Sequence, residues 1–406
     1  MRSEIQQEID LAKRSVNWGT LKTVCLAFLV IGAAAFLYEL FSGDAARAWS
    51  AYLTNYVYWT GLAFGTFLLS PVLVLTNATW GRPIKRLSES VVFFLPFSFI
   101  LLWPLFLGRA HVFWWVLHPE EQKAPWLNTP FFFTREGIGL FLIILIAALF
   151  ARNSVKSDTD YVEGKTGTVD RSRHQAALSS AYVILYAFVM TLVAFDMMMS
   201  LSPEWFSTLF GAYYFVVSFY AGLAFLAVLA TFAVKKMGLV NAIEKKQFHD
   251  LGKLLFAFCV VSLDFFYVQF LVIWYGNLPD ETRYVIWRVI YDPWAALAWT
   301  VLAVLFIIPF LVLVFRKIKL KPVLLASISI WILIGTWLEK FLLVTPSLSK
   351  SKSLPLGIFE VLITLGWLGL FGFCVFHFLE KYPVLVVSDP MLEIALEPEH
   401  EKVELA

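Results

Sequence analysis

The chain has 406 residues, of which 60% are hydrophobic and only 15% carry a charge. A soluble protein of this length needs a more polar surface, so the composition excludes a soluble globular fold. The formal net charge of +2 is no indication of nucleic-acid binding, because in a membrane protein basic residues mark the topology.

Ten apolar stretches are each long enough to cross a bilayer, which takes about 20 residues. The sequence therefore predicts an all-α integral membrane protein with about ten transmembrane helices. The expected spans lie at about 20–41, 52–76, 91–107, 131–151, 177–199, 208–234, 254–275, 294–315, 322–344 and 357–380.

The segments between spans indicate the topology. Lys and Arg are concentrated on the side of the N-terminus, which places both termini in the cytoplasm. Residues 1–19 are charged and are expected to form a cytoplasmic amphipathic segment rather than a cleavable signal. The ten-span domain covers 20–382, and its longest polar loop is expected at 152–176. Residues 383–406 form an acidic cytoplasmic tail, either solvated or docked on a partner.

Spans five and nine end alike. Asp196 is followed seven positions later by Pro203, and Glu339 is followed seven positions later by Pro346. This match indicates two copies of a four-helix unit related as parallel repeats. The alternative is that a short motif recurs by chance. The units cover about 52–203 (spans two to five) and 208–346 (spans six to nine), with spans one and ten peripheral.

Asp264 lies near the middle of the seventh span, and a charge at that depth is costly unless it is paired or functional. Tyr267 and Gln269 follow in the same span. Burial is expected to keep this carboxyl protonated and able to exchange a proton. The functional interpretation is a proton relay or a quinone-site acid. The alternative is a neutral Asp that hydrogen-bonds a neighbouring helix.

Asp196 and Glu339 are expected in the outer third of their spans, with Lys340 available to compensate Glu339. Equivalent places in two repeats favour a shared role, as the periplasmic mouths of two half-channels. The alternative is that each carboxylate reaches the interface or caps a neighbouring helix.

Further charged residues near span ends are interpreted mostly as interfacial salt bridges. His377 is a candidate cytoplasmic proton entry or an ordinary helix-end histidine. Trp126 and Trp205 flank span ends, as residues of an aromatic belt do. The secondary candidates are Arg135, Glu136, Arg288, Asp292 and Glu360.

A membrane-bound b-type haem needs two facing histidines, but of six histidines only His377 falls inside a span. No cysteine cluster, dinucleotide fingerprint or phosphate-binding loop is present in the sequence. We therefore predict no cofactor and no metal site in this chain. The cysteines, Cys25, Cys259 and Cys374, lie singly in three different spans.

Two stretches carry a resemblance to a known family: QFLVIWYGNLPDET at 269–282 and MSLSPEWFSTLFG at 199–211. Pro309-Phe310 upstream of Arg316 adds to it. The chain resembles the NrfD/PsrC-like integral membrane family, and within it the second, ActF-type, subunit of bacterial alternative complex III.

The resemblance covers about residues 20–380 and implies membership in a quinol:electron-acceptor oxidoreductase of the bacterial inner membrane. The implied partners are a paralogous NrfD-like subunit, an iron–sulfur/molybdopterin-like subunit, and multihaem and monohaem cytochrome c subunits. Iron–sulfur clusters and haem c are expected only in those partners. Quinol oxidation is implied mainly at the paralogue, and proton conduction in this subunit. Binding of quinone or quinol here is left open.

By position, Asp196 and Glu339 match acidic residues of the family, although Asp is more usual where Glu339 stands. Leu305 stands where members often have a histidine, so this chain departs from any site that depends on that histidine.

Three hypotheses follow. The first is a cofactor-free membrane subunit that scaffolds a quinol-oxidising complex and conducts protons through its buried acids. The second is a proton-coupled secondary transporter, which parallel repeats also suit, although no pair of Gly-interrupted spans frames a substrate site. The third is a purely structural subunit whose acids only link helices.

Overall fold

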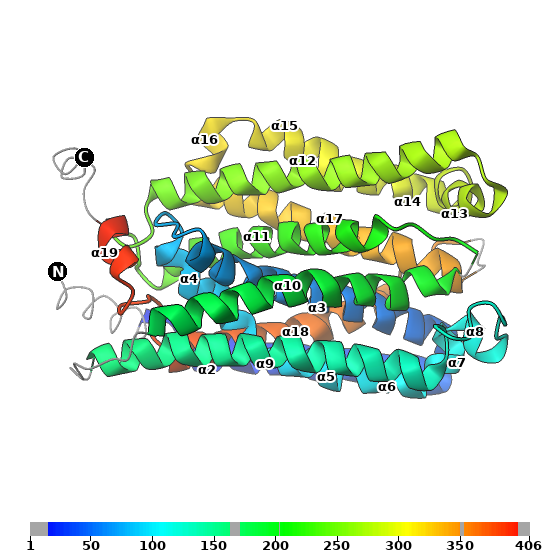
Figure 1. Ribbon diagram of the computed structural model, residues 1–406, viewed down its shortest axis with the longest axis horizontal. Coiled ribbons are helices and arrows are strands. Elements are labelled where there is room, and N and C mark those ends of the chain that lie inside the picture. Colours follow the sequence, from blue (N-terminus) through cyan, green and yellow to red (C-terminus); the bar gives the residue numbers. More distant parts are fainter. Residues whose placement is uncertain (1–14, 163–170, 203, 350–352, 397–406) are drawn as a thin grey trace.

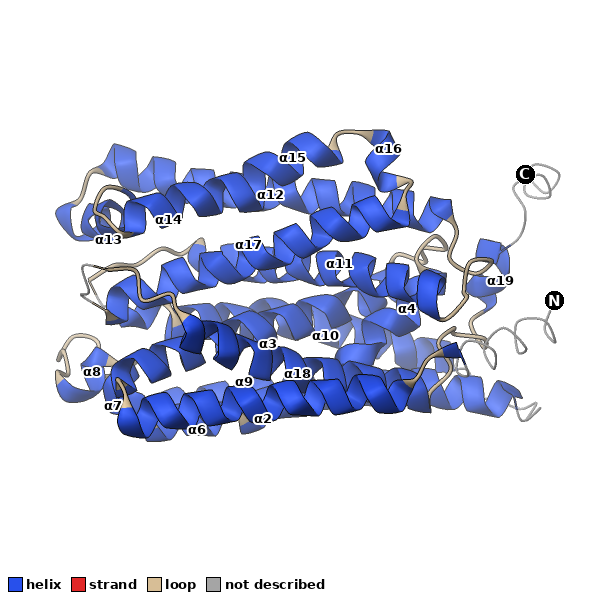
Figure 2. Ribbon diagram, turned by 180° about the vertical axis from the view of Figure 1, so that it is seen from behind, coloured by secondary structure: helices blue, strands red, loops and turns tan. Residues whose placement is uncertain are grey.

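The computed structural model describes residues 15–162, 171–202, 204–349 and 353–396. In these ranges every regular element is a helix (Figure 2). The predicted all-α membrane fold is therefore confirmed. Most of the expected segment 1–19, Pro203 of the repeat motif and the end of the acidic tail lie outside the described residues.

Ten helices or helix groups among the described residues are long and apolar enough to span a membrane, as predicted. Most of them extend beyond the expected bounds. They are α2 (Trp18–Ser42), α3 (Ala45–Leu75), α4 to α6 (Arg82–Leu107), α9 (Thr129–Val162), α10 (Arg171–Met197), α11 (Phe210–Lys236), α12 (Lys245–Gly276), α14 to α15 (Trp294–Leu313), α17 (Pro322–Leu348) and α18 (Ile358–Lys381).

Two of these spans are interrupted, mainly where prolines remove backbone donors. The third consists of α4 (Arg82–Glu89), the 3₁₀ turn η1 (Ser90–Phe93), α5 (Leu95–Ile100) and α6 (Leu102–Leu107). The eighth consists of α14 (Trp294–Val301), the π-helical η3 (Leu302–Ile307) and α15 (Ile308–Leu313). The short helices are α7 (Arg109–Val112), α8 (Trp114–Leu117), η2 (Met199–Leu201), α13 (Pro279–Val289), α16 (Arg316–Lys319) and α19 (Pro390–Leu396).

Helices α3 and α11 form the centre of the bundle, with 89% and 78% of their apolar windows buried (Figure 1). They are the first helices of the two expected units, and they pack against each other. A Cβ atom at Gly65 would lie 2.1 Å from the carbonyl oxygen of Ser218, and one at Gly222 would lie 2.4 Å from the amide nitrogen of Thr66. Only glycine permits this approach. The repeat relation itself stays a prediction.

Helices α2 and α18, the first and last spans, pack along each other. Gly32 meets Gly366 at their crossing, where a Cβ on Gly32 would lie 2.3 Å from the Cα of Gly366. Near one end of the pair, Lys22 forms an ion pair of 2.6 Å with Glu380.

The bundle has two ends (Figure 1). We call the end with the start of α2, the end of α18 and α19 the terminal end. The opposite end, with α7, α8 and α13, is the loop end. The placement of the terminal end in the cytoplasm stays a prediction from the loop charges.

The prediction of a polar loop at 152–176 is wrong over much of its length. Helix α9 continues to Val162 and α10 begins at Arg171. The polar side chains of the α9 extension are not all solvated: Ser154 and Asp158 are buried and have charged or polar partners, so the helix persists past the apolar stretch.

Substitution of Gly32 by Ala is expected to destabilise the chain by about 1–3 kcal/mol, because the added methyl group meets backbone that cannot move aside. The control is Gly276→Ala, where a Cβ meets nothing within 4 Å, with an expected change within about 0.5 kcal/mol. Detergent-titrated unfolding followed by tryptophan fluorescence measures both. Equal effects would contradict this packing.

Candidate functional site

An ion pair holds α9 and α10 together near the loop end. Arg135 donates from Nε to Oδ2 of Asp196 at 2.6 Å and from Nη2 to Oδ1 at 2.7 Å. Trp126 donates from Nε1 to the same carboxylate at 3.2 Å, and its ring lies 4.1 Å from the guanidinium. Asp196 is fully buried. The two-pronged geometry is the strong form of this interaction, and it gives Trp126 a more specific role than a belt residue.

Glu136 follows Arg135 on α9, and its interpretation as an interfacial salt bridge is wrong. It is 1% exposed, and neither of its carboxylate oxygens has a hydrogen-bond partner in the described part of the chain. It lies within electrostatic range of Asp196. We call Glu136 and Asp196 the loop-end acid pair. An acid without a protein partner, beside a carboxylate that is paired with arginine, is a candidate for exchanging a proton inside the membrane.

Glu339 and Lys340 are neighbours on α17, and both are buried. Nζ of Lys340 lies 2.7 Å from Oε2 of Glu339, without the geometry of a hydrogen bond. The ammonium also lies 4.7 Å from the ring centre of Tyr214 and 5.9 Å from that of Tyr213. The predicted compensation of Glu339 by Lys340 is present.

The acids of the two expected units converge on one tyrosine. Tyr214 of α11 is fully buried and lies within electrostatic range of both Glu136 and Glu339. Its hydroxyl donates to the carbonyl of Val57 at 2.7 Å. Asp196 and Glu339 are predicted from the sequence to be the mouths of two separate half-channels. In the structure, the close contact of α3 and α11 brings the groups around these two acids together.

A row of buried tyrosines continues from Tyr214 toward the terminal end. Tyr182 and Tyr186 stack with ring centres 6.3 Å apart. Their hydroxyls donate to the carbonyls of Phe64 and Phe215 at 2.9 and 2.7 Å. We call Tyr182, Tyr186 and Tyr214 the tyrosine row. Nearby buried hydroxyls without a hydrogen-bond partner among the described residues belong to Tyr56, Thr60 and Ser218.

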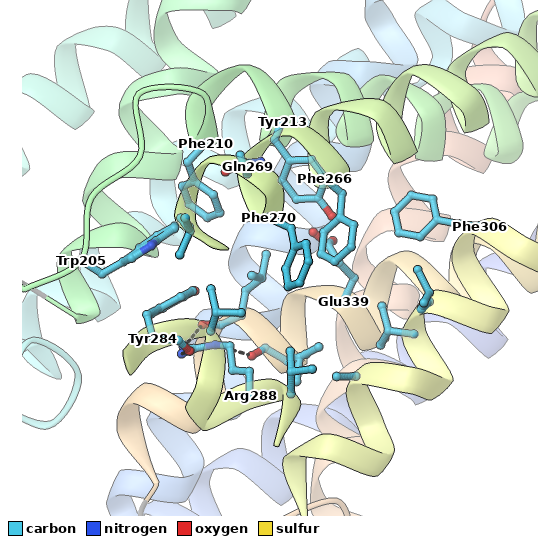
Figure 3. A pocket seen from close by; sticks show the side chains of 18 residues that line it. Trp205, Phe210, Tyr213, Phe266, Gln269, Phe270, Tyr284, Arg288, Phe306 and Glu339 are labelled. Atoms are coloured by element: carbon cyan, nitrogen blue, oxygen red, sulfur yellow. Dashed lines mark hydrogen bonds between the residues drawn. The ribbon is translucent and has the colours of Figure 1, made fainter. Parts of the chain in front are cut away.

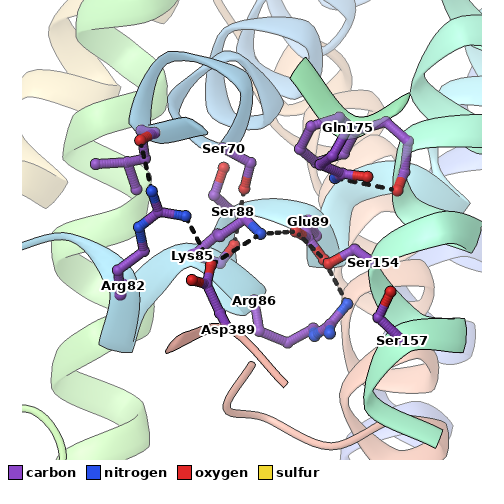
Figure 4. Close-up of polar contacts among 12 residues, drawn as sticks. Ser70, Arg82, Lys85, Arg86, Ser88, Glu89, Ser154, Ser157, Gln175 and Asp389 are labelled. Carbon is purple, nitrogen blue, oxygen red and sulfur yellow. Dashed lines mark hydrogen bonds and ion pairs between the residues drawn. The ribbon is translucent and has the colours of Figure 1, made fainter. Parts of the chain in front are cut away.

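At the terminal end lies a buried ion cluster that sequence reasoning missed (Figure 4). Arg86 of α4 bonds both Glu89 and Asp158, and all three are fully buried. Lys85 Nζ lies 3.7 Å from Glu89, which also accepts a hydrogen bond of 3.0 Å from Ser154. We call Lys85, Arg86, Glu89 and Asp158 the terminal-end ion cluster. The clue in the sequence is that Lys85 and Arg86 stand four and three positions before Glu89, a spacing that brings side chains together on a helix.

The C-terminal segment closes over this cluster. Asp389 pairs with Arg82 at 2.6 Å, and Ser388 donates from its hydroxyl and its amide to Asp158 at 2.6 and 2.9 Å. Val384 and Leu385, shortly before Ser388 in the chain, are buried. The start of the expected 383–406 tail is therefore docked on its own bundle rather than solvated.

Ser88, next to Glu89 of the terminal-end ion cluster in the chain, donates to the backbone of α3 close to the carbonyl that accepts from Tyr182. Pro71 lacks an N–H, which leaves the carbonyl of Phe67 without its helical donor. The Ser88 hydroxyl lies 3.4 Å from that oxygen and donates to the carbonyl of Thr66 at 2.7 Å. The carbonyl of Phe64, which accepts from Tyr182, lies two residues before Thr66 in α3, about 3 Å along the axis. Polar groups thus follow α3 between the two ends.

A cavity of about 130 Å³ lies beside Glu339 (Figure 3). Its walls are mostly apolar and aromatic, and come from α11, α12, α13, α14, η3, α17 and the segment before α11. A cavity of about 150 Å³ holds one benzene ring, so this space is about the size of one ring. The residues that frame it include Trp205, Tyr213, Gln269, Phe270, Tyr284, Arg288 and Glu339.

The interpretation of Arg288 as an interfacial salt bridge is wrong. Pro346 inside α17 leaves the carbonyl of Leu342 without its helical donor, and Nε of Arg288 donates to that oxygen at 3.2 Å. Its Nη2 donates to Ser347 at 2.6 Å, and its guanidinium lies 3.5 Å from the ring centre of Tyr284. Burial lowers the pKa of Arg288 from its ordinary value, with Tyr284 opposing that shift.

Asp264 and Tyr267 do not join these groups. Both side chains are exposed on the outer side of α12, so the expectation of a buried Asp264 is wrong. Depth along a span does not determine which face a residue occupies. Gln269 is on the other face, where it lines the cavity and accepts a hydrogen bond of 3.2 Å from Ser207.

The remaining candidates lie apart from the buried groups. The side chain of His377 is 45% exposed, with Nδ1 3.9 Å from Glu380. Asp292 is exposed. Glu360 pairs with Arg47 at 2.6 Å, as the salt-bridge interpretation predicts.

Within the described ranges, no three His, Cys, Asp or Glu side chains converge as a metal ion would require. Neither family models nor curated proteins gave a match to the chain. The site is therefore interpreted from its geometry and from the sequence resemblance.

Substitution of Arg86 by Met is expected to cost about 3–5 kcal/mol of folding stability, because it removes the buried guanidinium that pairs with both Glu89 and Asp158. The matched control is Arg283→Met, since Arg283 and Glu204 form an exposed pair at 3.1 Å, worth at most about 1 kcal/mol. Both are measured by detergent-titrated unfolding. A cost for Arg86→Met no larger than that of the control would contradict a buried cluster.

Proposed function

We propose that this chain is a cofactor-free membrane subunit of a bacterial quinol-oxidising respiratory complex, and that it conducts protons along α3. The observation that carries the proposal is a line of buried polar groups beside α3. It begins at the terminal-end ion cluster, continues through Ser88 and the tyrosine row, and ends at the loop-end acid pair.

Proton conduction needs groups that exchange protons and groups that relay them. The carboxyl groups at the two ends supply the first, and the buried hydroxyls between them supply the second. Buried hydroxyls without a protein partner are normally satisfied by internal water. Tyr56, Thr60 and Ser218 are of this kind, and water beside them would complete a relay between Tyr214 and Glu136.

Quinol contact is the second part of the proposal. The cavity beside Glu339 has the volume of one ring and aromatic walls, which suits a planar headgroup that arrives from the membrane. A carboxylate at its edge would accept a proton from a hydroxyl of such a ring. Haem c and iron–sulfur clusters would reside in the partner subunits, as the resemblance implies.

The chief alternative is a proton-coupled secondary transporter, for which the same buried acids would serve. A purely structural subunit is the other alternative. Co-purification distinguishes a transporter from a subunit of a complex. Substitution of a residue of the proposed proton path distinguishes a structural subunit from one that conducts protons.

Affinity purification of the tagged chain from its native membranes in mild detergent is expected to recover further subunits that carry c-type haem and iron–sulfur centres. A haem stain and a visible spectrum detect them. A single species of 46.3 kDa without a chromophore would contradict membership in a respiratory complex and favour the transporter.

Substitution of Glu136 by Gln is expected to slow proton transfer by the reconstituted protein at least about tenfold, because Gln keeps the shape but cannot exchange a proton. The readout is a pH-sensitive dye inside liposomes. The control is Glu204→Gln, at an exposed ion pair near the loop end. If both variants match the unmodified protein while folding equally well, Glu136 takes no part in proton transfer and the proposed path is contradicted.

A further inference from the structure

Helix α12 presents one continuous face to the outside of the bundle. One row of its exposed positions follows spacings of four and three residues, which place side chains on one side of a helix. Asp264 is the one acidic residue among them, and its neighbours on this face are apolar or aromatic along the inner part of the span. The face consists of Lys253, Ala257, Val260, Asp264, Tyr267, Leu271 and Trp274.

Asp264 lies deep in the membrane-spanning part of this helix. Its distance along the axis is about 28 Å from Lys245 and about 18 Å from Gly276, at 1.5 Å per residue. The hydrocarbon core of a bilayer is about 30 Å thick, so a span of this length keeps Asp264 well inside it.

The carboxyl group of Asp264 has no partner among the residues that the structure describes. No described residue forms a hydrogen bond or an ion pair with Asp264, and its side chain is exposed. Facing lipid, an ionised carboxylate costs at least about 2.5 kcal/mol, and a protonated one still leaves its hydrogen-bonding groups unsatisfied. An exposed acid at this depth is therefore stable only when something else covers it.

We propose that a transmembrane helix of a different protein packs along this face of α12 and presents a Lys or Arg side chain to Asp264. Charge complementarity identifies the partner, because a cation compensates the carboxylate and its donors satisfy the oxygens. A helix is required because its backbone is satisfied internally within the hydrocarbon. Tyr267 and Trp274 supply contact area on the loop-end side of Asp264.

A second copy of this chain does not fit the same face. A symmetric pair packed on α12 would bring two Asp264 carboxyl groups toward each other. The nearest basic residue of the face, Lys253, lies about 17 Å from Asp264 along the helix. The inference does not depend on the respiratory function, since any assembly with such a helix would satisfy it.

The test places a photo-crosslinking phenylalanine derivative at position 267, beside Asp264, in the full chain in its native membranes. The control places it at position 188, where Phe188 of α10 is 68% exposed. The expected product at 267 is an adduct with a transmembrane peptide of another protein that contains Lys or Arg, identified by mass spectrometry. Position 188 should not give this adduct.

Charge dependence distinguishes the proposed contact from simple proximity. Asp264→Leu should lower the adduct by about three- to twentyfold, the range of hydrogen-bond contributions within membranes, and Asp264→Glu should retain it. Detergent-titrated unfolding of the purified variants should be unchanged, because the residue is exposed. Adducts only with lipid or with a second copy of this chain would overturn the proposal, as would a yield unaffected by Asp264→Leu.

Discussion

A charged side chain inside an apolar bundle is costly unless it is paired, and in this chain most buried charges are paired, several of them between different helices. Between membrane helices, apolar surfaces distinguish neighbours poorly, because lipid is as apolar as the side chains. The pair of Arg135 and Asp196 joins α9 to α10, and the pair of Arg86 and Asp158 joins α4 to α9. Arg82 ties the C-terminal segment to α4. These contacts specify neighbours that hydrophobicity alone leaves undetermined.

Buried ion pairs are weak contributors to stability, since desolvation offsets most of the attraction between the charges. The buried ion pairs of this chain are therefore better explained by the selection of helix neighbours and by proton chemistry than by a contribution to folding stability. The glycine contacts between α3 and α11 support this explanation. They bring Tyr214 between acids of both units, where larger residues at Gly65 or Gly222 would hold the helices apart and interrupt the polar groups along α3.

The ten spans could be predicted because hydropathy and length suffice for a membrane helix. Asp196 and Glu339 could be found because an acid inside a span is costly. Lys340, beside Glu339 in the chain, was predicted as its partner, whereas the partners of Asp196 could not be found, because sequence gives depth but not the side of the helix. Asp264 illustrates this limit, being central in its span and yet exposed. The terminal-end ion cluster escaped prediction for another reason. Its basic residues lie near a span end, where Lys and Arg are interpreted as topology signals. Asp158 falls in a segment that was predicted to be a loop.

The two faces of α12 link the cavity to assembly. Phe266, Gln269 and Phe270 line the cavity, while Asp264 and Tyr267 point away from the bundle. Only 17% of the apolar window of α12 is buried against its own chain, so few internal contacts hold this wall in place. A partner helix on the outer face would press α12 toward α11 and α17 and fix the width of the cavity. Under both proposals, the shape of the cavity beside Glu339 depends on assembly, and the isolated chain should hold a ring there less well than the complex does.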